Sequence, residues 1–375
     1  MARFRLPTII LIVLIIAGAA IFWQIRLEKP QFFASVTEAL STEVNLDQYE
    51  RALRAREFRF PEDLGPHEGF QTEWWYYTGN LRDAGGRHFG YQLTVFRRAV
   101  SPEAVKRKSK WSTNQIYFAH FAVTDTASES FYSFERFSRE SAGLSGAQAH
   151  PFKVWIENWH IFEKEGKTII EAEDSGISIQ LSLSSEKQIV LQGDRGLSQK
   201  GAEPGNASYY YSQTRILSSG QIRIHSEAFT VSGYSWLDRE WSTSALSKQQ
   251  SGWDWFSIQL EDNREIMLFQ IRQGEKQISP FSGGTLVLAD GNTIRIKRSD
   301  FNIKVTDRWQ SPHTNIEYPS GWTVSLPKLN ITLQLEPYLA DQEHRHSFAY
   351  WEGAVKIRGE GVTGSGYVEL TGYKP

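Results

Sequence analysis

The segment TEWWYYTGNL, residues 72–81, carries the clearest strand pattern in the chain. Successive side chains of an extended backbone point to opposite faces, so Glu73, Trp75 and Tyr77 share one face. Trp74 lies on the other face. Aromatic residues in such a run are typical of β-strands. The segment therefore predicts a strand that carries a carboxylate among aromatic side chains.

Runs of β-branched and aromatic residues continue through both halves of the chain, separated by turn clusters of Gly, Asp, Asn and Ser. Asp290-Gly291 is a strong hairpin signal between two such runs, and Asp262-Asn263 is a weaker one. No long amphipathic helix pattern interrupts them, so the predicted fold class is all-β. The further runs lie at 88–98, 114–125, 152–162, 176–184, 208–217, 252–262, 264–273, 284–298, 321–327, 329–337, 347–359 and 362–372.

The number and order of the runs predict two tandem antiparallel β-barrels. Each half holds some seven to nine runs in consecutive order with short connections, which favours up-and-down barrels over a Greek-key sandwich. A propeller would need a repeat of about 40–45 residues, which the sequence lacks. An eight-stranded barrel can hold one small apolar ligand, and inward aromatic side chains would line it.

The composition excludes several classes of function. The chain has 375 residues, a formal net charge of -2 and no cysteine, so it offers neither a basic surface for nucleic acid nor a thiolate for metal binding or catalysis. No phosphate-binding loop, dinucleotide fingerprint or nucleophile elbow is present. His344 and His346 are spaced as a metal pair but lack a third ligand, which favours a solvated loop. We therefore predict no nucleic-acid partner, no cofactor and no metal.

The N-terminus predicts export. Arg3 and Arg5 precede the uncharged apolar run from Ile9 to Trp23, which is borderline in length between a signal peptide and a membrane span. The run continues past the small residues that could serve as a cleavage site. We therefore expect residues 6–23 to tether the protein to the inner membrane, with the bulk of the chain in the periplasm, or to be cleaved and the protein secreted.

Four segments follow from these patterns. Residues 1–23 are the anchor or signal peptide, and residues 24–57 are a tether, with one or two short amphipathic helices or a disordered stalk. Residues 58–245 and 246–375 are the two barrel domains.

The first candidate site surrounds Glu73. A carboxylate desolvated among aromatic side chains would have a raised pKa and could donate a proton. The simpler interpretation is a Glu paired with an arginine across the barrel mouth. Neighbouring candidates for ligand binding are His67, Trp74, Trp75 and Tyr77, together with His120 on a later apolar strand, although a lone histidine there is more often a hydrogen-bonded core residue.

The second candidate site is SWLDREW, residues 235–241. Alternation places Trp236, Asp238 and Glu240 on one face, while Arg239 and Trp241 lie on the other. Two neighbouring acids can split their pKa values into an acid and a base, or arginines can neutralise both.

A further acid, Asp254, lies between Trp253 and Trp255. It has the parity of Phe256, which points it into the second barrel, where an acid is either paired or functional. Because tryptophans cluster with acids here and in the two earlier segments, they indicate a candidate pocket near the domain junction.

Several long motifs resemble the carotenoid 1,2-hydratase (hydroxyneurosporene synthase) family, and more closely its AttH-like branch of secreted hydrolases. The motifs are HEGFQTEWWYYTGNL (67–81), AHFAVTD (119–125), SWLDREWSTSAL (235–246), GWDWFSIQLED (252–262), YWEGAVKIRG (350–359) and GSGYVELTGY (364–373). The resemblance runs from about residue 60 to the C-terminus. It implies two tandem lipocalin-like barrels, export, and association with ABC-type transport systems, whose permease is a possible partner.

The resemblance implies acid-catalysed hydration, but this chain departs from the pattern of the hydratases. Hydratases of the family protonate an isoprenoid double bond with an acidic residue, after which water captures the cation. Their motif histidine corresponds to Arg239 here, whereas Trp241 is kept. The following strand, residues 266–271, carries no acid where the hydratases have one.

Two hypotheses about function follow. The first is a carrier or transporter accessory that binds a lipid or another apolar small molecule by burying its surface. The second is a hydro-lyase or hydrolase that acts on an apolar substrate. Its proton donor would be Asp238, Glu240 or Glu73, and Trp74 and Trp241 would shield a cationic transition state.

Overall fold

The computed structural model describes residues 48–102, 113–243, 247, 249–274 and 277–374. The predicted anchor at 6–23 and most of the tether lie outside these residues. In the described part of the chain, no helix is both long and apolar enough to cross a membrane. Residues 48–57, the described end of the tether, contain no α-helix. Tyr49 and Ala52 are buried instead, and Leu53 is exposed.

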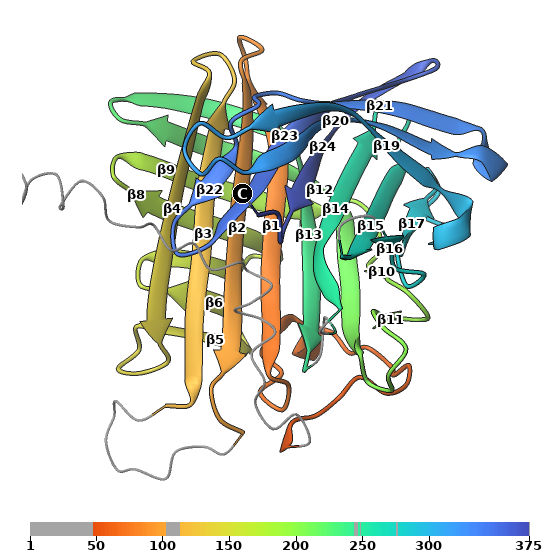
Figure 1. Cartoon of the computed structure of the whole chain (residues 1–375). Helices are drawn as coiled ribbons and strands as arrows, with labels where there is room; N and C mark the ends of the chain where they lie inside the picture. Colours follow the sequence, from red (N-terminus) through yellow and green to blue (C-terminus); the bar gives the residue numbers. More distant parts are fainter. Residues whose placement is uncertain (1–47, 103–112, 244–246, 248, 275–276, 375) are drawn as a thin grey trace, which may run out of the picture. The chain divides into compact units, whose positions relative to one another are not determined.

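Thirteen of the described strands form the first sheet (Figure 1). The strand order is β4-β3-β2-β1-β13-β12-β9-β8-β7-β6-β5, with β10 and β11 also paired to β12. The strands are β1 (Thr72–Asp83), β2 (His88–Ala99), β3 (Gln115–Asp125), β4 (Ser130–Arg139), β5 (Ser145–Ala149), β6 (Phe152–Ile156), β7 (Trp159–Lys164), β8 (Lys167–Asp174), β9 (Ile177–Ser185), β10 (Val190–Leu191), β11 (Leu197–Gln199), β12 (Ala207–Ile224) and β13 (Glu227–Ser242).

The second sheet contains eleven of the described strands in the order β18-β17-β15-β14-β24-β23-β21-β20-β19, with β16 on β15 and β22 on β23. The strands are β14 (Gln250–Leu260), β15 (Glu265–Gln273), β16 (Gln277–Ile278), β17 (Gly283–Val287), β18 (Thr293–Lys297), β19 (Asn302–Gln310), β20 (Glu317–Leu326), β21 (Ile331–Pro337), β22 (Glu343–Arg345), β23 (Ala349–Gly359) and β24 (Val362–Leu370). Short 3-10 turns lie at Glu62–Leu64, Arg298–Asp300 and Pro327–Leu329.

Both sheets follow the same plan. In each, consecutive strands run up and down and the last strand pairs with the first, β13 with β1 and β24 with β14. The open seam lies between β4 and β5 in the first sheet and between β18 and β19 in the second. The first sheet nearly closes into a barrel and the second forms a half-barrel. The all-β prediction of tandem lipocalin-like barrels is therefore confirmed, whereas the boundary at 245/246 stays a prediction.

Turn residues mark the strand ends. Asp290-Gly291 joins β17 to β18, and Asp262-Asn263 joins β14 to β15 with Asn263 at φ 65°. The predicted single run at 152–162 is wrong, because Glu157 adopts φ 55° and a turn divides it into β6 and β7. A pattern of alternating side chains does not reveal that a residue such as Glu157 adopts this left-handed backbone.

The strands around β1 are buried on both faces. Alternate residues such as Trp75, Tyr77 and Trp241 belong to the core inside the first barrel. The intervening residues, including Tyr76 and Trp236, pack against Trp255 and other side chains of the second sheet. β23 and β24 lie across β1 and β2 on this outer face (Figure 1). The alternation of aromatic residues thus serves two separate cores.

A buried ion network holds β1, β2 and β13 together inside the first barrel. The carboxylate of Glu73 accepts charge-assisted hydrogen bonds from Arg97 on β2 and Arg239 on β13. All three side chains are fully buried. Burial alone would raise the pKa of Glu73, but the two guanidinium groups and His67 outweigh it and hold that pKa well below its usual range. Glu73 is therefore ionised at neutral pH.

A second ion pair joins the two sheets. Glu265 on β15 accepts hydrogen bonds from Arg215 on β12 at 2.5 Å and from Lys187 at 2.8 Å. Gln259 on β14 donates to the backbone carbonyls of Thr214 and Ser235 at 2.8 and 3.0 Å. These contacts lie beside the aromatic layer and fix the second sheet against β12 and β13.

Replacing Glu73 with glutamine should destabilise the protein by about 3–5 kcal/mol, because Arg97 and Arg239 would remain buried without a counter-charge. Chemical denaturation monitored by tryptophan fluorescence measures this loss. The matched control is Glu317→Gln, which breaks an exposed pair with Arg308 and should cost less than about 1 kcal/mol. Equal effects of the two substitutions would contradict a structural role for the network.

Candidate functional site

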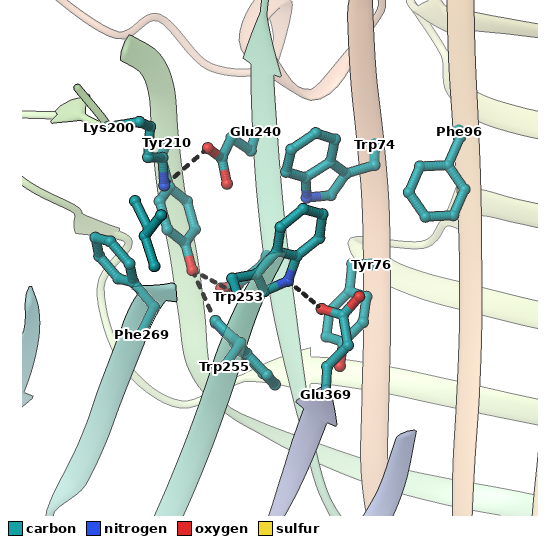
Figure 2. A pocket seen from close by; sticks show the side chains of 12 residues that line it. Trp74, Tyr76, Phe96, Lys200, Tyr210, Glu240, Trp253, Trp255, Phe269 and Glu369 are labelled. Atoms are coloured by element: carbon teal, nitrogen blue, oxygen red, sulfur yellow. Dashed lines mark hydrogen bonds and ion pairs between the residues drawn. The ribbon is translucent and has the colours of Figure 1, made fainter. Parts of the chain in front are cut away.

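A pocket lies between the outer face of the first sheet and the second sheet (Figure 2). Strands β1, β2, β12 and β13 form one wall, β14, β15 and β24 form the other, and Lys200 follows β11. The cavity volume is about 70 Å³, smaller than the roughly 300–1,000 Å³ of typical small-molecule sites, and the pocket opens to solvent on one side. The lining residues are Trp74, Tyr76, Phe96, Lys200, Tyr210, Asp238, Glu240, Trp253, Trp255, Phe269, Ile271 and Glu369.

Strand alternation explains which side chains reach this pocket. Residues opposite one another in an antiparallel pair point to the same face, and Trp74 on β1 is paired with Glu240 on β13. The next residues on that face are Tyr76 and Asp238, which are also paired. β1 and β13 therefore present two aromatic rings and two acids side by side to the second sheet.

Asp238 is buried at the base of the pocket and accepts three hydrogen bonds. Ser212 Oγ donates at 2.5 Å, Trp236 Nε1 donates at 2.7 Å, and the Tyr210 hydroxyl is the third donor. Burial raises the pKa of Asp238 to about 7, although these hydrogen bonds act in the opposite direction. Asp238 can thus exchange a proton near neutral pH, but its oxygens are already occupied by protein donors.

Glu240 is paired with a lysine that sits among aromatic rings. Lys200 Nζ lies 3.1 Å from Glu240 Oε1. The same ammonium group lies 4.4 Å from the centre of the Phe269 ring and 5.2 Å from that of Tyr210 (Figure 2). Aromatic faces attract cations, so this part of the pocket already stabilises a positive charge.

Glu369 reaches the pocket from β24. Its Oε2 accepts a hydrogen bond from Trp253 Nε1 at 3.1 Å (Figure 2). Burial raises the pKa of Glu369 to about 7, against the effect of the Trp253 hydrogen bond, and the nearby Asp238 and Glu240 add to the rise. Glu369 therefore exchanges its proton near pH 7 in a largely aromatic pocket, and one of its oxygens is not bonded to Trp253.

The structure brings only some of the predicted site residues together in this pocket. Trp74, Asp238 and Glu240 line it, and Trp236 orients Asp238 from behind. The prediction of a pocket near the junction of the two halves thus has a counterpart in the structure. The facing of Trp236, Asp238 and Glu240 agrees with the alternation pattern.

Most of the other candidates lie inside the first barrel, on the opposite face of the same strands. Glu73 is ionised and bound by arginines, so it has no proton to donate and does not reach the pocket. His67 stacks on Trp241 with ring centres 3.7 Å apart and lies 3.3 Å from Glu73. Arg239 lies 4.0 Å above the Trp75 ring, and Tyr77 belongs to the same core. These residues form one structural network.

Asp254 points away from the pocket into the second half of the molecule. It pairs with Arg272 at 3.1 Å and accepts a hydrogen bond from the Tyr373 hydroxyl at 3.0 Å. Burial raises its pKa, although Arg272 and Tyr373 act against the rise. The neighbours of Asp254 in sequence, Trp253 and Trp255, have the opposite parity and line the pocket.

His120 lies on the outer face of β3, outside the pocket lining. Its Nδ1 is 2.7 Å from the Tyr350 hydroxyl and its Nε2 is 3.2 Å from Glu135. His344 is fully buried and stacks on Tyr350, so the predicted solvated loop at 344–346 is wrong. Across the residues that the structure describes, no group of three or more potential ligands is arranged to bind a metal ion.

The sequence patterns did not mark Glu369, Lys200 or Phe269, whereas Trp253 and Trp255 belong to the predicted clusters of tryptophans and acids. Glu369 alternates with Tyr367 in a motif of the C-terminal strand, and that alternation is the one signal that could have marked it. Nothing in the sequence near Lys200 indicates that it meets Glu240. These residues join the site only because distant strands pack together.

The AttH-like family model matches residues 51–373. The chain is 31% identical to an AttH protein from Nitrosomonas europaea whose crystal structure is known, over 86% of this chain and 99% of that one, with a TM-score of 0.78. No curated protein matches the chain.

Two more distant structures share the fold alone. Kievitone hydratase from Nectria haematococca is 13% identical, over 87% of this chain and 96% of that one, with a TM-score of 0.65. CghA, solved with Sch210972, is 11% identical, over 85% and 94% of the two chains, with a TM-score of 0.50. The match of the family model over nearly the whole described part, together with the similarity to the Nitrosomonas protein, shows that the chain belongs to the AttH-like family.

Proposed function

We propose that the pocket between the sheets binds an apolar, unsaturated small molecule and that Glu369 transfers a proton to it, as in a hydro-lyase. The observation that carries this proposal is a carboxyl group with a pKa of about 7 in a pocket lined mainly by aromatic rings. A general acid works best when its pKa lies near the working pH. A purely structural carboxylate would be expected to have an arginine or lysine partner, as Glu73 has.

The aromatic wall supports the charge that such a reaction develops. Protonation of a carbon–carbon double bond moves the Glu369 proton to one carbon and leaves a positive charge on the other. Trp74, Trp253 and Trp255 line the pocket around the acid, and their ring faces stabilise a cation. The Phe269 and Tyr210 rings already do so for the Lys200 ammonium group.

Water completes the proposed reaction. A water molecule forms the new carbon–oxygen bond and gives up one proton, which returns to a carboxylate of the pocket, so that no other reactant is consumed. Asp238 is suited to accept that proton because its pKa is about 7. The Lys200–Glu240 pair offers a polar partner for a hydroxyl group on the ligand.

A carrier without catalysis is the second candidate. It is favoured by the three protein donors that occupy Asp238, and by the strand at 266–271, which lacks the acid expected from the hydratases. Export, the anchor at 6–23 and an ABC permease partner belong to either version of the proposal. They rest on the N-terminal sequence and on the family resemblance.

Replacing Glu369 with glutamine should abolish the proposed turnover while ligand binding is kept. The molecule that co-purifies is identified by mass spectrometry of an organic extract, and its conversion is followed in water labelled with heavy oxygen. We expect the wild type to add one labelled water and E369Q to do so about 100-fold more slowly or worse. The control is Glu336→Gln, an exposed acid on β21. A retained ligand with no mass change would favour the carrier instead.

The pH dependence provides a second test. The pKa of Glu369 is raised from 4.5 to about 7, so the acid form is present below pH 7 and is lost above it. Turnover should fall about tenfold per pH unit on the alkaline side, where Glu369 loses its proton, and should also fall on the acid side, where Asp238 is protonated and cannot accept the proton from water. The pH profile of kcat measures this. A rate that rises through pH 7 would show that an ionised base, rather than the Glu369 acid, is required.

A further inference from the structure

A second acid lies directly behind the pocket. Glu352 on β23 is opposite Glu369 on β24 in the antiparallel register. It has the parity of Tyr350 and Ala354, which pack against the first sheet, so both carboxyl groups point to the same face. Glu352 is 1% exposed and does not line the pocket.

Two carboxyl groups in this relation cannot both be ionised at little cost. Side chains directly opposite one another have Cβ atoms about 4.5–5.5 Å apart. Carboxylates on neighbouring side chains away from water repel each other, and such a pair loses its two protons in separate steps. Oε1 of Glu352 has no hydrogen-bond partner among the described residues. An unpaired buried carboxyl oxygen is far less costly when the group is neutral.

The surroundings of the pair agree with a retained proton. The titratable groups that bear on Glu352 or Glu369 are tyrosines and acids from β1, β13, β23 and β24. Burial, together with Glu369, raises the pKa of Glu352 well above its ordinary value. Its neighbours Tyr76 and Tyr350 act in the opposite direction but do not cancel the rise. The tyrosines and acids that act on Glu352 or Glu369 are Tyr76, Asp238, Glu240, Tyr350 and Tyr367.

We propose that Glu352 is a positioning residue for the pocket acid: it holds a proton directly opposite Glu369 and passes one to it after each transfer to the ligand. This role rests on the proposed function of Glu369. In the step, the O–H bond of Glu352 breaks as a new O–H bond forms on Glu369, so the charge left by the first transfer moves one strand away from the ligand.

A hydrogen-bonded chain from Tyr350 to Glu135 lies beside Glu352. The Tyr350 hydroxyl is two residues along the same face of β23, and His120 Nδ1 lies 2.7 Å from it. His120 Nε2 in turn lies 3.2 Å from Glu135, whose side chain is 10% exposed. Burial alone would raise the pKa of Glu135, but hydrogen bonds from His120 and Ser347 outweigh it and lower that pKa, so Glu135 is ionised at neutral pH and supplies no proton. Glu352 regains its proton instead from the one that water gives up to Asp238, passed on through Glu369, so that no outside proton is consumed.

Infrared spectroscopy tests the stored proton without any substrate. At about pH 9, where ordinary carboxyl groups are ionised, the wild type should still show the carbonyl stretch of one protonated carboxyl group. Glu352→Gln should remove that band, and the exposed control Glu336→Gln should keep it. Glu369→Gln should shift the loss of the band to lower pH, because the charge that opposes ionisation of Glu352 is gone.

The proposal is overturned if the wild type and E352Q have the same spectrum at about pH 9, or if E369Q leaves the midpoint unchanged. E369Q provides an independent reading should E352Q fail to fold. Once the proposed reaction can be assayed, E352Q should also lower kcat with little change in KM. If the band behaves as expected but E369Q turns over the ligand at the wild-type rate, the proposed function of Glu369 is refuted. The inference about the pair of carboxyl groups is then still supported.

Discussion

The carboxylate of Glu73, held between Arg97 and Arg239, is the constraint on which the site depends. The three residues come from adjacent strands and are completely buried, so none can leave the network without exposing an uncompensated charge to the barrel interior. A slip of one residue in either strand pair would turn every side chain to the opposite face. The network therefore specifies the register of β1, β2 and β13, and with it the facing of Trp74 and Asp238.

Register matters here because these strands have no solvated face. One set of alternate residues fills the first barrel, and the other set meets the second sheet. The many aromatic residues of the chain are thereby divided between a closed core and a layer that is incompletely filled. The pocket is the gap in that layer, and it inherits aromatic walls from both sheets (Figure 2).

The acids of the molecule behave differently on the two faces of the same strands. Glu73 is paired with arginines and has a lowered pKa, whereas Asp238 and Glu369 lack such partners and have pKa values near 7. Burial has the same sign for all three, so the difference comes from the neighbouring charges. This contrast separates a structural acid from the acids suited to proton transfer. Glu352, which lies opposite Glu369 on the neighbouring strand, belongs with the second group.

The sequence alone determined the all-β class, the tandem barrel plan and the facing of residues within each strand, because period-two alternation and turn residues are local properties. It marked Asp238, Glu240 and Trp74, but it ranked Glu73 and His67 with them, since alternation cannot tell which face of a strand meets a core and which meets a pocket. Only the tertiary structure brought Glu369 to Asp238 and Trp74. Glu369 lies more than a hundred positions from either residue, and their meeting depends on how the second sheet packs across the first.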